Sequence, residues 1–372
     1  MQSTPNIKYK IALTVGASIS PSITFKTGVP QNIAFLFDLL KLLGHEVTLV
    51  TEENISVSNI SLSKQKSYPI ISLSSTYKTN KLDLLLEIGQ TLTPTARSKT
   101  SSTGCKIISV RCGNSLIIDM EDLFTKSSKQ TGFQHVKNGL DHIWILPHHT
   151  HQATYLESLL DAKSSVMPYI WEPDFLHDNF NNPSFRDKPN VYIMEPNMSV
   201  LKNALIPLVI LNNQYLYSPH SFNKAYIVNG QQFANDPYFL NNIVKNLDVL
   251  NGNIAKDKVF FTPRCTFQDA LTYPDILLSH QWLNGLNYLS LEALYLGVAL
   301  VHNSEYLKGV GYFYPEFDAA LGQKALNEAL SNHEHSFSQQ RDENRLFLKQ
   351  YSIFNKSVQD GYTELITNAL NN

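Results

Sequence analysis

Apolar and polar residues alternate along the first half of the chain in blocks that predict strands followed by helices. Residues 10–17 form an apolar run typical of a buried strand, and residues 31–43 carry apolar side chains at helical spacing. Gly44 ends this helix, and the next apolar strand follows at 47–51. Because strands that alternate with helices favour a parallel sheet, residues 1–172 are predicted to form a Rossmann-like domain. Its remaining predicted strands are 82–89, 106–112 and 142–147.

The pattern restarts after residues 173–188, which are rich in Asn, Asp and Pro and are predicted to form a linker. A second Rossmann-like domain is then predicted over 189–345. The helical segment 346–372 is predicted to cross back and pack on the first domain. The predicted elements of the second domain are strands at 191–195, 225–230, 258–263, 275–280 and 298–303 and helices at 199–212 and 236–250, with a further helix after Asn284.

Length and charge narrow the possible functions only slightly. A chain of 372 residues suits two domains, since a single hydrophobic core rarely grows that large. The net charge is −2, but residues 1–168 contain 16 Lys and Arg against 12 Asp and Glu. This mild basic excess would suit an anionic acceptor or peripheral contact with a membrane, although scattered solvated lysines are the simpler explanation. No basic cluster is dense enough to indicate nucleic acid.

The cysteines and the apolar runs indicate the cellular compartment. Cys105, Cys112 and Cys265 are an odd set without metal-ligand spacing, which favours a reducing environment over a disulfide framework. The first twenty residues do not resemble a secretory signal, and no apolar run reaches the length of a membrane-spanning helix. We therefore expect a cytoplasmic protein.

Several sequence blocks, in order, resemble the GT-B glycosyltransferases and, more narrowly, an uncharacterised bacterial family of glycosyltransferase-like proteins. The blocks are TGVPQNIAFLFDLL, WILPHH, PYIWEPDFL, IMEPNMSVLKN, SHQWLNGLNYLSLEALYLGVALVHNS and GYFYPEFDA. The resemblance covers nearly the whole chain. It implies an α/β GT-B fold, in which two Rossmann-like domains face each other across a cleft and the C-terminal helix returns to the first domain.

The resemblance also assigns two residues of the second domain. Retaining GT-B enzymes commonly carry two glutamates separated by seven residues, the second of which hydrogen-bonds the ribose of the nucleotide-sugar donor. Glu292 matches that second position, whereas Asn284 replaces the carboxylate that would contact the donor sugar. From the residues alone, Glu292 would also suit a helix-dipole role and Asn284 a turn before Gly285. We favour nucleotide binding for Glu292 and leave both interpretations of Asn284 open.

The same resemblance implies that basic side chains and backbone N–H groups, without a metal ion, neutralise the pyrophosphate leaving group. Lys202 matches the family's basic residue, although it would also suit a solvated helix position, and Arg264 would be a second cation. Asn303 and Ser304 follow a predicted strand at a point where backbone N–H groups would meet phosphates. Tyr312 belongs to an aromatic run that would otherwise close the domain core. No Asp-x-Asp metal motif accompanies these residues.

In the first domain, the resemblance points to the loops after the predicted strands. Gly28 resembles the glycine of the acceptor-facing loop, where the lack of a side chain permits close backbone approach. His148 and His149 follow a strand, and an imidazole there would assist proton transfer or bind the donor sugar. Arg111 would join them. The histidines would equally suit a helix cap or a surface turn, and the spacing of the nearby carboxylates does not complete a zinc site.

The leading hypothesis is therefore a metal-independent glycosyltransferase that moves a hexosyl or pentosyl group from a nucleotide-diphosphate sugar to a glycan, glycoconjugate or other acceptor, as in polysaccharide biosynthesis. Because Asn284 replaces a carboxylate, the alternative is a noncatalytic nucleotide- or glycan-binding protein of GT-B shape. A glycosyltransferase for modified DNA bases is a third hypothesis, which the near-neutral charge disfavours. A dehydrogenase is set aside because no G-x-G-x-x-G turn follows the first strand.

Overall fold

The chain folds into two compact α/β units, described here one at a time. The first unit comprises residues 1–172 and 350–372, and the second comprises residues 173–349. The computed structural model describes residues 7–16, 28–55, 58–62, 66–77, 81–125, 135–177, 180, 183–233, 235–251 and 257–371.

The first unit is built on a sheet in the order β3-β4-β2-β1-β5-β6-β7-β8, and every adjacent pair is parallel except β3 and β4. The predicted parallel Rossmann-like arrangement is confirmed for this unit. Its strands are β1 (Lys10–Thr14), β2 (Glu46–Thr51), β3 (Ser58–Ser61), β4 (Ser67–Ser72), β5 (Leu84–Glu87), β6 (Lys106–Arg111), β7 (His142–Ile145) and β8 (Ser164–Val166). Its helices are α2 (Val29–Leu42), η1 (Leu73–Tyr77), α3 (Pro94–Ser101), α4 (Ser115–Thr125), η2 (Pro147–Gln152), α5 (Ala153–Leu160) and α11 (Lys356–Asn371), with η8 (Lys349–Tyr351) leading into the last of these.

Gly44 ends the first helix as predicted. Helix α2 stops at Leu42, and Gly44 adopts a φ of 91°, in the left-handed region that favours glycine. The chain can therefore turn at once into β2, which pairs in parallel with β1.

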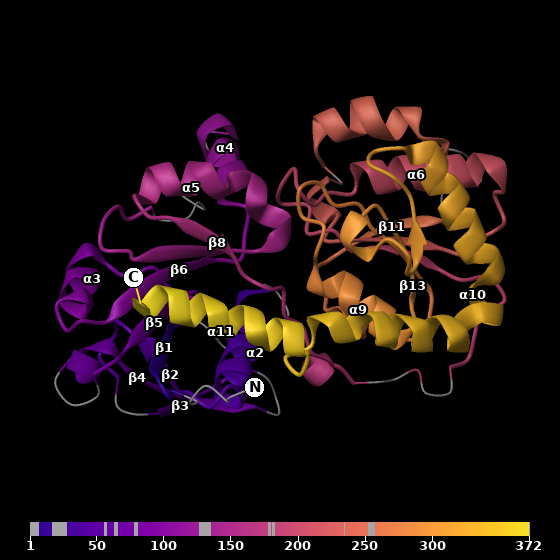
Figure 1. Cartoon of the computed structure of the whole chain (residues 1–372). Helices are drawn as coiled ribbons and strands as arrows, with labels where there is room; N and C mark the ends of the chain where they lie inside the picture. Colours follow the sequence, from indigo (N-terminus) through magenta and orange to yellow (C-terminus); the bar gives the residue numbers. More distant parts are fainter. Residues whose placement is uncertain are drawn as a thin grey trace. The chain divides into compact units, whose positions relative to one another are not determined.

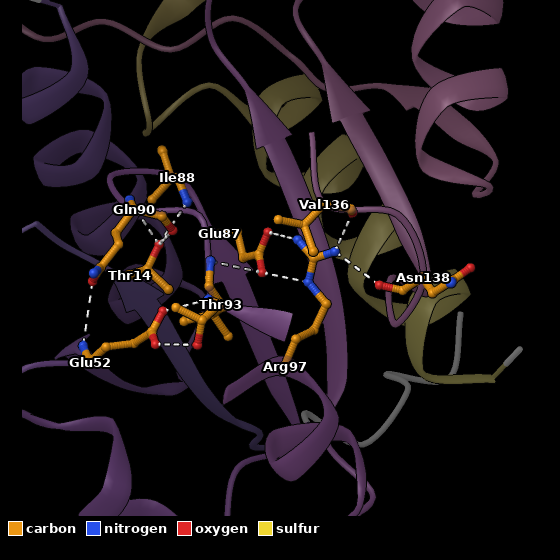
Figure 2. Close-up of polar contacts among 10 residues, drawn as sticks. Thr14, Glu52, Glu87, Ile88, Gln90, Thr93, Arg97, Val136 and Asn138 are labelled. Atoms are coloured by element: carbon orange, nitrogen blue, oxygen red, sulfur yellow. Dashed lines mark hydrogen bonds and ion pairs between the residues drawn. The ribbon is translucent and has the colours of Figure 1, made fainter. Parts of the chain in front are cut away.

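A buried ion pair organises the end of β5 (Figure 2). Arg97, on α3, donates from Nε and Nη2 to the two carboxylate oxygens of Glu87, at 3.0 and 2.7 Å. Its Nη1 donates to the carbonyl oxygens of Val136 and Asn138. Both charged side chains are almost fully buried. The guanidinium group thereby ties the end of a central strand to α3 and to the segment before β7.

A threonine fixes the loop that follows β5 (Figure 2). The hydroxyl of Thr14, at the end of β1, accepts from the backbone N–H groups of Ile88 and Gln90 and donates to the Gln90 carbonyl at 2.6 Å. A Cβ atom at Gly89 would lie 2.8 Å from the Thr14 carbonyl oxygen, so the two strand ends approach as closely as backbone allows.

The C-terminal helix α11, yellow in Figure 1, packs on the first unit beside β6. Tyr362 meets Trp144 of β7 edge to face, with ring centroids 6.2 Å apart, and its hydroxyl donates to the Pro168 carbonyl at 3.0 Å. The Glu172 carboxylate accepts from Ser352 Oγ at 2.6 Å and from the Ile353 N–H at 2.7 Å. The prediction that the end of the chain returns to the first domain is confirmed.

The second unit is built on a sheet in the order β11-β10-β9-β12-β13-β14, in which every adjacent pair is parallel, as predicted. Its strands are β9 (Val191–Ile193), β10 (Ala225–Val228), β11 (Val259–Thr262), β12 (Ile276–Leu278), β13 (Ala299–His302) and β14 (Tyr312–Phe313). Its helices are η3 (Pro173–Phe175), α6 (Leu205–Tyr217), η4 (Gln231–Phe233), the π-helix η5 (Phe239–Ile243), η6 (Val244–Asn246), α7 (Asp248–Asn251), α8 (Phe267–Ala270), α9 (Tyr288–Leu296), η7 (Glu305–Leu307) and α10 (Ala319–Leu348).

The core of the second unit forms between the sheet and the helices α6 and α10. Leu208 and Leu211 of α6 and Leu326 of α10 are fully buried with Ile193 and Val301 of the sheet. Because both helices cover the sheet with apolar side chains, the polar residues at the strand ends are positioned by a rigid layer beneath them.

Two predicted helices of the second unit were wrong in detail. The helix predicted at 199–212 begins only at Leu205, because Asn197 adopts a φ of 56° and its side chain accepts from the Ala204 N–H at 2.8 Å, which holds the preceding residues in a loop. The helix predicted at 236–250 is divided into a π-turn, a 3-10 turn and a short α-helix. The short strands β3, β4, β8 and β14 were not predicted.

The predicted linker 173–188 includes residues 178–179 and 181–182, which lie outside the described residues. Of its described residues, Phe180 accepts a 2.7 Å hydrogen bond at its carbonyl from Arg341 of α10, and Phe185 packs edge to face on Phe337. Among the described parts of the chain, none of the helices combines the length and the apolar character needed to cross a bilayer.

Removing the guanidinium group of Arg97 should strongly destabilise the first unit. Arg97→Met leaves the Glu87 carboxylate buried without its ion-pair partner, and breaking such a pair costs about 3–5 kcal/mol. Urea unfolding checks this. The matched control is Lys99→Met on the same helix, where an exposed ammonium group lies over the Tyr77 ring and contributes at most about 1 kcal/mol. Equal effects of the two substitutions would contradict the organising role of Arg97.

Candidate functional site

Polar side chains gather at the carboxyl ends of the central strands of the second unit. Glu195 follows β9, Ser279 and His280 follow β12, Asn303 follows β13 and Tyr314 follows β14. All four strands are parallel, so their carboxyl ends meet at one edge of the sheet. In doubly wound folds this is the edge at which ligands bind.

Glu195 lies at the centre of this edge and is only 1% exposed. Its Oε1 atom accepts from Ser279 Oγ at 2.6 Å and from the His280 backbone N–H at 3.1 Å. Its Oε2 atom accepts from Gln281 Nε2. Three successive residues of the loop after β12 therefore converge on one carboxyl group at the end of β9.

The burial of Glu195 changes its protonation. Removal of the carboxyl group from water raises its pKa to about 7, against the opposing effects of its hydrogen bonds and of the charge of Lys202. Burial in turn lowers the pKa of the Lys202 ammonium group, and the charge of Glu195 opposes that shift. Among the described residues, Lys202 Nζ makes no hydrogen bond or ion pair, so its charge is available to a ligand.

The backbone around Lys202 belongs to the loop that Asn197 holds before the first residue of α6. Asn197 donates its backbone N–H to the Lys202 carbonyl at 3.1 Å, and its side chain donates to the Val228 carbonyl at the end of β10. The Leu201 carbonyl accepts from the Trp282 N–H at 2.9 Å. These bonds join the Lys202 loop to the loop after β12.

His280 and Tyr314 form a buried pair beside Glu195. The Tyr314 hydroxyl donates to the Ser279 carbonyl at 3.0 Å, so its oxygen accepts from His280 Nδ1, also at 3.0 Å. Burial lowers the pKa of His280 to about 4, which keeps the ring neutral. His280 Nε2 is buried and has no hydrogen-bond partner among the described residues, which leaves one acceptor at the strand ends unsatisfied.

Asn284 and Gly285 begin the loop that leads into α9. Asn284 is 6% exposed, and its Nδ2 donates to Gln281 Oε1 at 2.9 Å. A Cβ atom at Gly285 would lie 2.8 Å from the Tyr306 ring, and the Gly285 carbonyl accepts from Ser304 Oγ. The loop after β12 and the loop after β13 thus touch at a position where a side chain in place of Gly285 would require the Tyr306 ring to move.

Glu292 lies in the second turn of α9, five residues after the helix cap. Asn287 caps the helix, and its side chain accepts from the Leu289 N–H at 3.2 Å. Glu292 is 8% exposed, so its carboxylate is not a solvated helix-surface group. Gly297, with a φ of 80°, ends the helix, and a Cβ atom there would lie 2.7 Å from Phe337.

Asn303 and Ser304 join the ends of β12 and β13. Asn303 Oδ1 accepts from the Gln281 N–H, and its Nδ2 donates to the Gln281 carbonyl, both at 2.9 Å. The buried His302 donates from Nε2 to the Val310 carbonyl at 2.9 Å and accepts the Ser304 N–H at Nδ1. The amide N–H of Ser304 is thus engaged within the protein.

The structure brings together some of the residues predicted from sequence and not others. Lys202, Asn284, Asn303 and Ser304 belong to the strand-end network described above. Tyr312 does not, because its hydroxyl accepts from Gln340 of α10 at 3.1 Å, although its ring shares the hydrophobic core with Tyr314. The side chain of Arg264, after β11, is exposed and approaches Met198 Sδ at 3.9 Å.

The predicted residues of the first unit also follow strand ends. Arg111 ends β6 and is 4% exposed; burial lowers its pKa, and the charge of Glu87 opposes this shift. His148 and His149 lie in η2 after β7, buried, with ring centroids 4.0 Å apart. Gly28 caps α2 with a φ of −70°, a conformation that any residue adopts, and its carbonyl accepts from Asn32 Nδ2 at 2.8 Å.

Four residues at the centre of the network were not predicted: Glu195, Ser279, Gln281 and Tyr314. Each lies within a block that carried the resemblance, yet none has a spacing that distinguishes it from a core or turn residue. A usable indication was the polar or charged residue placed directly after each apolar strand. Within the described residues, no three His, Cys, Asp or Glu side chains group as metal ligands.

Replacing the Glu195 carboxyl group by an amide should change how stability depends on pH. The folded-state pKa of about 7 lies above the ordinary value of 4.5, so the stabilisation due to the protonated carboxyl is complete below about pH 4.5 and is lost as pH rises through about 7. Relative to Glu195→Gln, the wild type should therefore lose about 3 kcal/mol of unfolding free energy between about pH 4 and pH 8.

Urea unfolding at several pH values measures this difference. The control is Glu328→Gln, which removes an exposed carboxylate on α10 and should alter stability by no more than about 0.5 kcal/mol at any pH. A difference between the wild type and Glu195→Gln that stays constant with pH would show that burial does not raise the pKa of this carboxyl group above its ordinary value.

Comparison with solved structures identifies the fold. A glycosyltransferase from Rickettsia africae superposes with a TM-score of 0.58 at 13% identity and covers 98% of this chain and 99% of its own. The pneumococcal O-GlcNAc transferase GtfA, bound to UDP and GlcNAc, gives 0.55 at 9% identity over 98% and 100%. HepE from Anabaena, bound to UDP-glucose, gives 0.54 at 12% identity over 97% and 100%. The two Rossmann-like units thus constitute a GT-B fold, as the sequence predicted.

Sequence comparison identifies the family. No curated protein matches the chain significantly. The model of a family described as a protein of unknown function, DUF2827, matches residues 11–366, which include nearly all of the first sheet, the whole second sheet and every strand-end residue of the second unit described above. The chain is therefore a member of the DUF2827 family with the fold of the GT-B glycosyltransferases.

Proposed function

We propose that the protein is a glycosyltransferase that transfers a sugar from a nucleotide-diphosphate donor to a glycan or glycoconjugate acceptor. The observation that carries the proposal is the polar network at the carboxyl ends of β9, β12 and β13. There a half-buried lysine, whose ammonium group makes no hydrogen bond or ion pair with any described residue, lies near a set of fixed amide and hydroxyl groups. Two of the similar structures are bound to UDP or UDP-glucose, which supports a nucleotide sugar as the donor class.

The chemistry requires that the negative charge of the departing diphosphate be stabilised. Lys202 supplies a positive charge at the strand ends, and Arg264 is an exposed cation after β11, at the edge of the same sheet. Because the Asn197 loop fixes the backbone at Lys202, the Lys202 charge is held at the strand ends before the leaving group departs. The proposal therefore assigns this role to side chains and requires no divalent metal.

The proposal divides the remaining roles between the units. Glu292 binds the ribose of the donor, and Asn284 contacts the donor sugar, as the resemblance implies. Arg111, His148 and His149 of the first unit bind the acceptor or assist its deprotonation. We place the reaction in the cytoplasm, because three cysteines without metal-ligand spacing favour a reducing environment.

Loss of the Glu292 carboxylate should weaken nucleotide binding. Calorimetry of the wild type with UDP, ADP, GDP and dTDP should identify one diphosphate that binds, and Glu292→Gln should weaken that diphosphate about tenfold or more, because a charge-assisted hydrogen bond is lost. The matched control is Glu328→Gln, which should bind as the wild type does. The assignment fails if none of the four diphosphates binds at millimolar concentration or if Glu292→Gln binds equally well.

Loss of the Lys202 charge should lower the affinity for a nucleoside diphosphate more than the affinity for the matching nucleoside. Lys202→Met keeps the aliphatic stem and removes the ammonium group, so affinity for the diphosphate should fall about tenfold or more while affinity for the matching nucleoside stays within about twofold. The control is Lys324→Met, an exposed position on α10. Wild-type diphosphate binding that disappears in EDTA and returns with Mg²⁺ would contradict the assignment of the charge to side chains.

A second candidate function is a noncatalytic nucleotide- or glycan-binding protein, favoured by the neutral amide of Asn284 in place of a carboxylate. Slow hydrolysis of the donor separates the two functions. A glycosyltransferase should release free sugar from its own donor without acceptor, whereas a binding protein should release none from any member of a nucleotide-sugar panel.

A further inference from the structure

Three side chains form a continuous hydrogen-bonded chain from the interior of the second unit to the loop before α9. Asn284 Nδ2 donates to Gln281 Oε1 at 2.9 Å, and Gln281 Nε2 donates to Glu195 Oε2. The other carboxyl oxygen of Glu195 is already occupied by Ser279 Oγ and the His280 N–H. The side chains of Asn284, Gln281 and Glu195 are all at least nine-tenths buried.

The order of donors and acceptors along this hydrogen-bonded series is fixed, because an ionised carboxylate can only accept hydrogen bonds. With Glu195 ionised, Gln281 must turn its amide nitrogen towards Glu195 and its oxygen towards Asn284. Asn284 must then turn its own nitrogen towards Gln281. Its Oδ1 atom is left over, and no described residue donates to it.

We infer that Glu195 and Gln281 are positioning residues that hold the Asn284 amide with its carbonyl oxygen towards the donor sugar, so that the site recognises a sugar hydroxyl through a neutral acceptor. The inference rests on the proposed function, because that function places a donor sugar at Asn284. The inference explains how an amide can replace a carboxylate at position 284. A carboxylate presents an acceptor oxygen in either orientation, whereas the amide does so only because the hydrogen bonds to Gln281 and Glu195 orient it.

Protonation of Glu195 releases this constraint. A protonated Oε2 can donate to Gln281 Oε1, which would reverse both amides and turn Asn284 Nδ2 towards the sugar. The charged and titratable groups near this carboxyl are Lys202 from the loop after β9, His280 from the loop after β12 and Tyr314 from the end of β14. His280 stays neutral above about pH 4, so within the neutral range the orientation follows Glu195 under the field of Lys202.

The test uses the sugar increment, defined as the ratio of the affinities for UDP-glucose and UDP, with ADP-glucose and ADP as a second pair. Gln281→Leu and Asn284→Leu should each reduce the increment about fivefold or more while the diphosphate itself binds within about twofold of wild type. The control Gln323→Leu removes a comparable half-buried amide, which donates to Gln214 of α6, and should leave the increment unchanged.

A conservative substitution separates positioning from simple structural support. A carboxylate has two equivalent acceptor oxygens and needs no neighbour to orient it. Asn284→Asp should therefore retain the increment, and adding Gln281→Leu to Asn284→Asp should no longer reduce it. A structural role of Gln281 predicts the same loss in both backgrounds.

The pH profile supplies an independent measurement that does not require a substitution at Gln281 or Asn284. The wild-type increment should change about threefold or more between about pH 6 and pH 8, whereas in Glu195→Gln it should vary no more with pH than the titration of free UDP requires. That titration is common to all variants and cancels in the comparison.

The outcomes distinguish this inference from the proposed function. If UDP or ADP binds the wild type but the sugar increment is absent, or is equal in the wild type, Gln281→Leu and Asn284→Leu, the inference is wrong and the nucleotide site stands. If Glu195→Gln follows the wild-type pH profile, the positioning role of Glu195 is wrong. If the wild type binds none of UDP, ADP, GDP and dTDP, and none of the corresponding nucleotide glucoses, the proposed function fails and the inference fails with it.

Discussion

The arrangement of the second unit depends on the burial of one carboxyl group at the end of its central strand. A polar group taken out of water costs stability unless hydrogen bonds replace those it loses. Glu195 obtains its replacements from Ser279, His280 and Gln281, three consecutive residues of the loop after β12. Because all three donors lie in one short segment, satisfying the carboxyl group also fixes the course of that segment.

Further ties extend from this loop to the neighbouring strands. Gln281 exchanges two hydrogen bonds with Asn303 after β13, and Ser279 accepts at its carbonyl from Tyr314 after β14. The Ser304 hydroxyl then reaches the Gly285 carbonyl, in the loop before α9. A network whose members are mutually satisfied is stiffer than separate bonds, so the strand ends are held in one arrangement. The first unit uses a comparable device, in which Arg97 and Glu87 join a strand end to a helix and a loop.

The sequence predicted the architecture more completely than the site. Apolar runs such as 298–303 become strands and Gly44 and Gly297 end helices because these properties are local: they depend on side-chain spacing and on the left-handed conformation that glycine adopts easily. The start of α6 could not be predicted, because the Asn197 side chain that accepts from the Ala204 N–H is itself held by the Val228 carbonyl of β10, 31 residues further along the chain. The role of Glu195 was hidden for the same reason, since its partners lie more than 80 residues away along the chain.

Tyr312 and Tyr314 lie two positions apart and differ in the partners of their hydroxyl groups. Both rings are buried in the same hydrophobic core, on either side of Phe313, where the strand ends. The Tyr312 hydroxyl accepts from Gln340 of α10, whereas the Tyr314 hydroxyl joins the network through Ser279 and His280. An aromatic run in a sequence does not distinguish these positions, because the partners of each hydroxyl lie 28 or more residues away along the sequence.

The balance of charge at the strand ends follows from the same burial. Ionised carboxylates at positions 284 and 195 would add to the negative charge of a nucleotide diphosphate. Here Asn284 is neutral, and desolvation holds Glu195 close to the protonated state. When Glu195 carries its proton, the charge of Lys202 is no longer offset and the field at the strand ends favours an anion. When Glu195 ionises, the direction of the amide chain is fixed but part of that field is cancelled. In the proposed function, the same buried proton therefore links the strength with which this edge of the sheet attracts phosphate to the orientation of Asn284.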